Sequence, residues 1–221
     1  MKTAATVIVV LALFSFIHKE HKNKAQPAVF SRPPITYSGT IQTGGPQTET
    51  AGPESATGQL QPEYTANDAL AKQQIIKFAK TQYRSLAVSD EKLDEIAGKI
   101  VKYSTIYGID YALAAALIAR ESRFNPNAVS SHGAKGLGQL IDSTSAALGV
   151  SNPYDIDQNL NGAFKYFRGL MDRWPNRADQ ADLALASYLL GPRGVEGGSL
   201  SESARSYISD VLSTRDRIKS M

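Results

Sequence analysis

The 221-residue sequence predicts a mainly α-helical domain, on three observations. Apolar residues from position 68 onward recur at intervals of three and four, as they do on one face of a helix. Residues that cap helix starts precede these segments, and Gly or Pro follows several of them. Strand patterns are few. We therefore expect a helix from Asn67 or Asp68 to about Tyr83, and further helices over 89–107, 110–123, 140–148, 158–174, 179–190 and 201–218.

The chain begins with an apolar run over residues 4–17 behind Met1-Lys2. Its 14 residues are short for a bilayer-spanning helix, which needs about 20, and fit the core of a signal peptide. No convincing cleavage site follows, so residues 1–24 are interpreted as either a signal peptide or an uncleaved membrane anchor with a basic flank. Three lysines follow the run and one precedes it, which favours a cytoplasmic C-terminal side.

Residues 25–67 are rich in Pro, Gly, Thr, Ser and Gln. Few of them could contribute to a core, so this stretch is predicted to be a flexible, disordered linker. The remaining segment, 68–221, has about 150 residues, which is enough for a helical domain with a core of its own. We expect the chemistry of the protein to lie in this domain.

The composition excludes several classes of site. The chain has no cysteine and three scattered histidines, so neither a disulfide framework nor a metal site is expected. No Gly-rich phosphate motif follows a strand pattern, and we expect no cofactor. The net charge of +3 is small and no basic stripe is present, so nucleic acid is not an expected partner.

Glu121 is the first candidate for a chemical role. It lies near the end of the predicted helix 110–123, which Asp110 would cap and whose residues 111–119 are apolar on every face. The end of a helix dipole gives a carboxylate no support, and apolar neighbours disfavour its ionised form. Both effects predict a raised pKa for Glu121, as a general acid near neutral pH requires.

A glycine-rich loop follows this helix. Gly133 and Gly136 enclose Ala-Lys, and Gly138 precedes Gln139. Glycines at this spacing permit positive φ and a close approach of the backbone to a ligand. Backbone amides, Gln and Ser suit an extended sugar chain, which has hydroxyl and acetamide groups and little charge. His132, in the same loop, is more readily interpreted as an exposed loop residue than as a ligand contact.

Several separated motifs together resemble the soluble lytic transglycosylases, lysozyme-like enzymes that cleave the glycan strands of bacterial peptidoglycan. The resemblance covers about the last two thirds of the chain. Its motifs are Glu121-Ser122, the Ser-x-x-Gly-Ala-x-Gly-Leu-x-Gln segment over 130–139, Asn-Pro-Tyr-Asp at 152–155, Gln-Asn at 158–159, Gly-Ala at 162–163 with Tyr166, and Ser-Tyr-Leu-Leu-Gly-Pro at 187–192.

The resemblance implies a lysozyme-like catalytic domain over 68–221 that cleaves the β-1,4 bond between N-acetylmuramic acid and N-acetylglucosamine. Glu121 would act alone, first as acid and then as base, and give a 1,6-anhydro product. Tyr188 matches the family residue that approaches the catalytic carboxyl group, where a phenol could orient it. Tyr207 matches a position that borders the cleft, although a core aromatic is an equal interpretation. The substrate-binding residues expected on this basis are Ser122, Gly136, Leu137, Gln139, Tyr188 and Tyr207.

Two alternatives stay open. Leu189 replaces an Asn of the family signature, which favours a non-catalytic protein that binds peptidoglycan or assists assembly. A lysozyme-type hydrolase in a phage particle is the other, and it would need a second carboxylate. Asp142 and Asp155 are nearest in sequence, although capping or turn roles explain both.

The expected partners are peptidoglycan strands and, through the N-terminal segment, a membrane. An envelope-spanning machine or a phage particle are further settings. The expected location is the cell envelope, facing peptidoglycan, or a virion if a phage encodes the chain.

Overall fold

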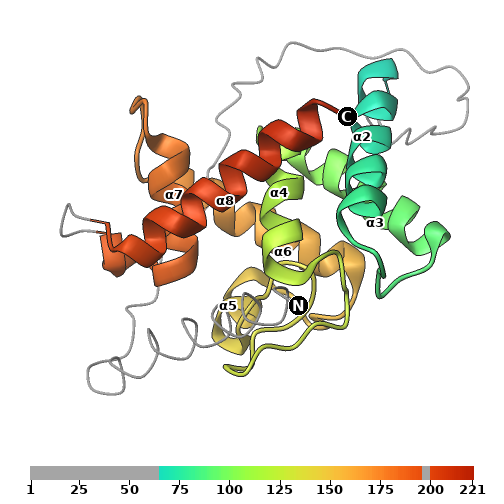
Figure 1. The fold of residues 1–221 in the computed structure, drawn as a ribbon. Helices are drawn as coiled ribbons and strands as arrows, with labels where there is room; N and C mark the ends of the chain where they lie inside the picture. Colours follow the sequence, from blue (N-terminus) through green and yellow to red (C-terminus); the bar gives the residue numbers. More distant parts are fainter. Residues whose placement is uncertain (1–64, 196–199) are drawn as a thin grey trace, which may run out of the picture. The chain divides into compact units, whose positions relative to one another are not determined.

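The computed structural model describes residues 65–195 and 200–221, which belong to one compact unit, Tyr64–Met221. The apolar run 4–17 and most of the expected linker lie outside these residues. The described part folds into helices: α2 Ala66–Gln82, α3 Asp90–Ile106, α4 Tyr111–Ser122, α5 Asp142–Leu148, α6 Ile156–Met171, α7 Gln180–Leu190, a 3₁₀ turn η1 Pro192–Val195, and α8 Glu202–Lys219. A mainly α fold is therefore confirmed (Figure 1).

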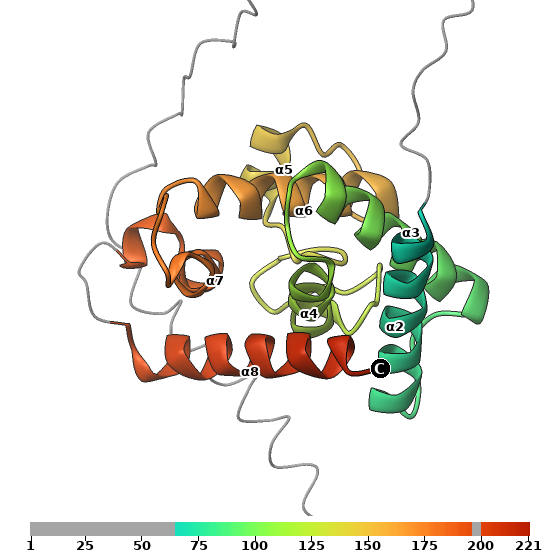
Figure 2. The same ribbon diagram turned by 90° about the horizontal axis from the view of Figure 1, so that it is seen from above.

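Helix α4 is the centre of the domain. Its residues from Ala112 to Ala119 are all buried. Figure 2 looks down on the domain with α4 in the middle and α2, α3, α6, α7 and α8 around it. Helix α8 packs along α4, and α2 and α3 also contact it. The small alanine side chains of α4 let these neighbours approach closely, so a helix that is apolar all round is buried all round.

The segment between α4 and α5 has no regular secondary structure. Two isolated antiparallel bridges organise it, Val129 with Lys135 and Lys135 with Leu140. The expected helix over 140–148 therefore begins two residues late, at Asp142, because Leu140 is held in a bridge. Ile141 occupies the N-cap position and makes no side-chain capping bond.

Other helix boundaries shift for local reasons. Thr65, rather than Asn67 or Asp68, caps α2, and Asp68 completes a reciprocal capping box with it. Helix α6 begins two residues early because Asp155 caps it, and it ends at Met171 rather than Trp174. The turn η1 was not expected. Asp110 caps α4 as expected, and Ser89 and Ser201 cap α3 and α8.

None of the helices within 65–195 and 200–221 has the length and apolar character needed to cross a bilayer.

Candidate active site

Glu121 lies in the last turn of α4, so the buried central helix fixes the position of its carboxyl group. Tyr207 on α8 donates a hydrogen bond from its phenol to Oε1 of Glu121, with 2.5 Å between the oxygens. The ring of Tyr207 is 2% exposed. Because α4 and α8 pack side by side, two residues 86 positions apart in sequence meet at the end of α4. Tyr207 is thus a core aromatic, one of its two interpretations, and it also contacts the candidate acid.

Arg120 adds a positive charge to this contact. Its guanidinium carbon lies 5.2 Å from the centre of the Tyr207 ring, within the range of a cation–π contact. Its Nε is 3.8 Å from Oδ2 of Asp210, one turn after Tyr207 on α8. Arg120 therefore covers the tyrosine that holds Glu121.

The pKa of Glu121 is raised above its ordinary value, as expected. Burial of the carboxyl group is the main cause, and the Tyr207 hydrogen bond and the Arg120 charge partly offset it. Burial and the nearby Glu121 charge also raise the pKa of Tyr207 and Tyr188 well above the usual value. Both phenols are therefore protonated near neutral pH and able to donate hydrogen bonds.

The turn after α4 is held in an unusual backbone conformation. Arg123 and Phe124 have φ values of 54° and 61°, in the left-handed region that non-glycine residues seldom adopt. Phe124 is fully buried, with its ring 6.3 Å from that of Tyr83, and the Tyr83 hydroxyl donates to the carbonyl of Ala119 at 3.2 Å. Core packing therefore fixes the direction in which the chain leaves Glu121.

The glycine-rich loop folds back on itself through Gln139. The side-chain nitrogen of Gln139 donates to the carbonyls of Gly136 at 2.9 Å and Ala128 at 3.2 Å. Both bonds use the amide nitrogen, so the Gln139 oxygen is the atom that could accept a bond from a sugar hydroxyl. Gly136 has φ 75°, and a Cβ atom there would lie 2.1 Å from the carbonyl oxygen of Pro153. Only glycine fits this position.

Asn159 on α6 connects the loop to the helical core. It is fully buried; its Oδ1 accepts from the amide of Gly138 at 2.7 Å, and its Nδ2 donates to the carbonyls of Pro153 at 2.8 Å and Lys135 at 3.1 Å. Every strong polar atom of this side chain is thus occupied by loop backbone. The Gln-Asn motif drew attention to the position, but the sequence did not indicate this role.

Tyr188 lies close enough to Glu121 for the carboxylate charge to raise its pKa, but its hydrogen bond goes to the loop. Its hydroxyl donates to the carbonyl of Gly138 at 2.6 Å rather than to Glu121. The ring is held between Tyr166, 5.5 Å away, and Phe167, 6.1 Å away, which aims the hydroxyl at the loop. Tyr188 thus holds the loop, and Tyr207 is the tyrosine that bonds to the acid.

Three other expected site residues are largely enclosed. Leu137 is fully buried in the core, and Gly136 is also buried, so a ligand would meet their backbone at most. Ser122 is 8% exposed and its hydroxyl donates to the carbonyl of Ile118.

Leu189, the departure from the family signature, is half-buried and packs against the core. His132 is partly exposed, and its Nδ1 lies 3.1 Å from the Ser131 hydroxyl.

The two alternative carboxylates have other partners. Asp155 caps α6 by accepting from the amide of Gln158 at 2.8 Å, as expected. Asp142 does not cap α5; it forms an ion pair with Lys135 at 2.6 Å, and its side chain is 75% exposed. Residues 65–195 and 200–221 contain no group of three or more side chains suited to hold a metal ion.

Glu121 thus lies in the last turn of a central helix that other helices enclose, as in the mainly α, lysozyme-like domain expected from the sequence. The family model described as "Transglycosylase SLT domain" matches residues 99–207, which include Glu121, the loop and Tyr207. This domain of the chain belongs to the SLT transglycosylase family.

Similar proteins are also named transglycosylases. The "Membrane-bound lytic murein transglycosylase F" of Marinobacter nauticus is 32% identical over 123 residues, which cover 51% of this chain and 24% of that protein. The protein of the same name from Pseudoalteromonas translucida is 41% identical over 86 residues, which cover 38% of this chain and 18% of that protein. The chain therefore spans about a quarter or less of the length of these relatives.

Proposed function

We propose that the domain is a peptidoglycan lytic transglycosylase in which Glu121 is the only acid–base group. The observation that carries the proposal is the half-buried Glu121 side chain, whose carboxyl group has a raised pKa and accepts a hydrogen bond from Tyr207. Among the described residues, the polar groups that alter the pKa of Glu121 are Tyr207 and Arg120, and no second carboxylate acts on it. The family and the names of the similar proteins support the same reaction and substrate.

The proposed reaction has two proton transfers. Glu121 gives its proton to the glycosidic oxygen as the bond from that oxygen to C1 of the muramic acid breaks. The resulting carboxylate then takes the proton of the 6-hydroxyl of the same sugar, and O6 forms a bond to C1. The acid is regenerated and no water is consumed. Attack within one sugar ring is favoured because a held nucleophile can reach effective molarities of about 10⁵ M or more.

Each neighbour supports one part of this cycle. Tyr207 holds one carboxyl oxygen and stabilises the ionised form between the two transfers. Arg120 adds to that stabilisation by its charge. The loop is held by Asn159, Gln139 and Tyr188, and it offers the side-chain oxygen of Gln139 to the sugars. Because the relatives are called membrane-bound, we place the activity in the cell envelope. The comparisons give no support to a phage particle.

The product tests the proposal. Purified peptidoglycan is digested with the full chain, with Glu121→Gln and with Glu202→Gln, which alters an exposed glutamate in the first turn of α8. We expect 1,6-anhydro ends from the wild type and Glu202→Gln, detected by mass spectrometry as products one water lighter than reducing ends. Loss of the acid should slow Glu121→Gln by about 10²–10⁴.

Two results would contradict the proposal. A digest dominated by reducing ends would indicate a hydrolase and require a second carboxylate. A wild-type chain that binds peptidoglycan without cleaving it would favour the non-catalytic alternative.

A further inference from the structure

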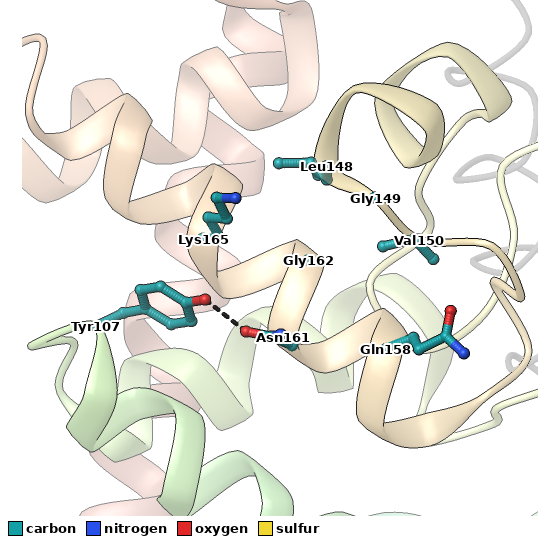
Figure 3. Close-up of a pocket in the computed structure, with 8 residues that line it drawn as sticks. All are labelled: Tyr107, Leu148, Gly149, Val150, Gln158, Asn161, Gly162 and Lys165. Carbon is teal, nitrogen blue, oxygen red and sulfur yellow. Dashed lines mark hydrogen bonds between the residues drawn. The ribbon is translucent and has the colours of Figure 1, made fainter. Parts of the chain in front are cut away.

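A pocket separate from the groups around Glu121 lies where the end of α3, the end of α5 and the first half of α6 meet (Figure 3). Its volume is about 150 Å³. Helix α6 supplies one wall through Gln158, Asn161, Gly162 and Lys165. These positions are spaced as i, i+3, i+4 and i+7, so they form one face of the helix. Asn159, which holds the loop beside the candidate acid, lies off that face.

One side of the pocket is apolar. Leu148 and Val150 line it at the end of α5. Gly162 allows this close approach, since a Cβ atom there would lie 2.6 Å from Cγ2 of Val150. The absent side chain therefore brings an apolar surface against the polar face of α6. A ligand of this pocket needs a small apolar group.

The polar wall of the pocket presents donors. Tyr107, the C-cap of α3, donates to Oδ1 of Asn161 at 2.5 Å, which leaves the Asn161 amide nitrogen to bond a ligand. Three hydrogen bonds from Ser151 and Asn152 use Oε1 of Gln158, so its nitrogen is also left as a donor. Lys165 is exposed and pairs with no acidic group in the part of the chain that the structure describes. Figure 3 shows its side chain beside the pocket.

We propose that this pocket binds the carboxyl-terminal alanine of a peptide, with its methyl group on Leu148 and Val150 and its carboxylate on Lys165 and Asn161. An ammonium and amide donors suit a carboxylate, which only accepts hydrogen bonds. A volume of about 150 Å³ holds one small residue. The choice of ligand rests on the proposed function, because peptidoglycan strands carry short peptides that end in D-alanine. The pocket would then bind the peptide of a strand, apart from the cleavage point.

Binding can be measured without cleavage. The full chain is titrated with acetyl-D-alanine, with acetyl-D-alanine amide and with acetyl-L-alanine, and binding is followed by NMR shifts of the pocket residues. We expect the acid of D-configuration to bind and the amide, which lacks the charge, to bind at least about tenfold more weakly. Absence of binding, or equal binding of acid and amide, would overturn the site. Equal binding of the D and L acids would overturn the assignment to peptidoglycan peptides.

Three variants locate the binding. Lys165→Met removes the charge and keeps the stem, and Asn161→Asp keeps the shape but places a carboxylate against the ligand. Each should weaken binding of acetyl-D-alanine by at least about tenfold. Lys80→Met, which removes the same charge on α2, is the matched control and should bind as the wild type does. Equal weakening by all three variants would mean general electrostatic attraction and would overturn the site.

Failure of this inference and failure of the proposed function are distinguishable. Lys165→Met should leave the cleavage of glycan strands stripped of peptide unchanged, because Lys165 lies outside the groups that hold Glu121. On peptidoglycan that carries peptides, the same variant should have a higher KM and an unchanged kcat. A chain that binds acetyl-D-alanine at Lys165 but cleaves no glycan would keep the pocket and reject the enzyme.

Discussion

At the scale of single residues, two opposing influences act on the Glu121 carboxyl group. Burial disfavours its ionised form, whereas the Tyr207 hydroxyl and the Arg120 charge favour it. A group that both gives and takes a proton in one cycle needs such a balance, because a strongly shifted pKa in either direction would block one of the two steps. The sequence predicted the burial effect from the apolar helix. The hydrogen bond from Tyr207 could not be found in that way, since the tyrosine comes from a helix 86 positions away, although the resemblance had named Tyr207 as a site residue.

Replacement of the acid should stabilise the fold in a pH-dependent way. Because the pKa of Glu121 is raised in the folded state, the stability that this group contributes is fully present below its ordinary pKa of 4.5 and is lost as the pH rises through the folded-state pKa. Glu121→Gln has no proton to lose. Its thermal midpoint should match the wild type at about pH 4 and exceed it at about pH 8. Glu202→Gln should show no such pH-dependent gain. Equal midpoints of Glu121→Gln and wild type at both pH values would contradict a raised pKa.

Removal of the Tyr207 hydroxyl should alter both rate and pH dependence. Tyr207→Phe keeps the ring under Arg120 but loses the bond to Glu121, so kcat should fall by about 10- to 100-fold. The same bond lowers the pKa of Glu121. Its loss should move the decline of kcat/KM at high pH to still higher pH.

Tyr188→Phe is the control for this change. It removes a hydroxyl that bonds to Gly138 rather than to the acid, so kcat/KM should decline at the same pH as in the wild type. If the pH at which kcat/KM declines is unchanged in Tyr207→Phe, or shifts equally in both variants, Tyr207 does not lower the pKa of the catalytic acid.

Among the helices, α6 has two structural roles, one on each of two faces. One face carries Asn159, which holds the loop beside Glu121, and the other lines the pocket between α3, α5 and α6. The sequence indicated α6 through its periodic apolar residues, and a glycine-rich loop through residues 133–138. It did not indicate that one buried amide joins them, because a lone Asn in a helix gives no sign of which distant carbonyls it will meet.

Loss of the Asn159 amide should unfold the loop before the helices. Asn159→Leu leaves the Gly138 amide and two carbonyls without their partner, at about 1–3 kcal/mol for each group left unsatisfied. We expect a loss of about 3 kcal/mol or more in the free energy of unfolding by urea, together with loss of activity. Asn161→Leu, on the same helix but exposed, should cost less than about 1 kcal/mol. Similar costs for the two variants would mean that Asn159 does not organise the loop.

At the scale of the whole molecule, α2 and the end of α8 close the shell around α4. The side chain of Gln74 donates to the carbonyl of Lys219 at 3.1 Å, and Lys77 donates to the carbonyl of Met221 at 2.7 Å. Lys219 also pairs with Asp110, the cap of α4, at 2.8 Å. The C-terminus therefore lies beside α2 (Figure 2). The fold class followed from periodicity, whereas this closure did not, because each of these contacts joins helices that are far apart in sequence.

The first residues of α2 should then decide where the domain can be cut. A chain that begins at Tyr64 keeps the Thr65–Asp68 capping box, whereas one that begins at Asp68, the boundary expected from sequence, loses it. Loss of such a cap costs about 1 kcal/mol, which for a domain of this size lowers the thermal midpoint by about 2–4 °C. We expect both chains to fold and to digest peptidoglycan, with the longer one more stable by that amount. Thr65→Ala in the chain that begins at Tyr64 should reproduce most of the difference, which separates the cap from the two helical residues also lost. Inactivity of the chain from Tyr64, under conditions where the full chain is active, would show that residues before α2 contribute to the site.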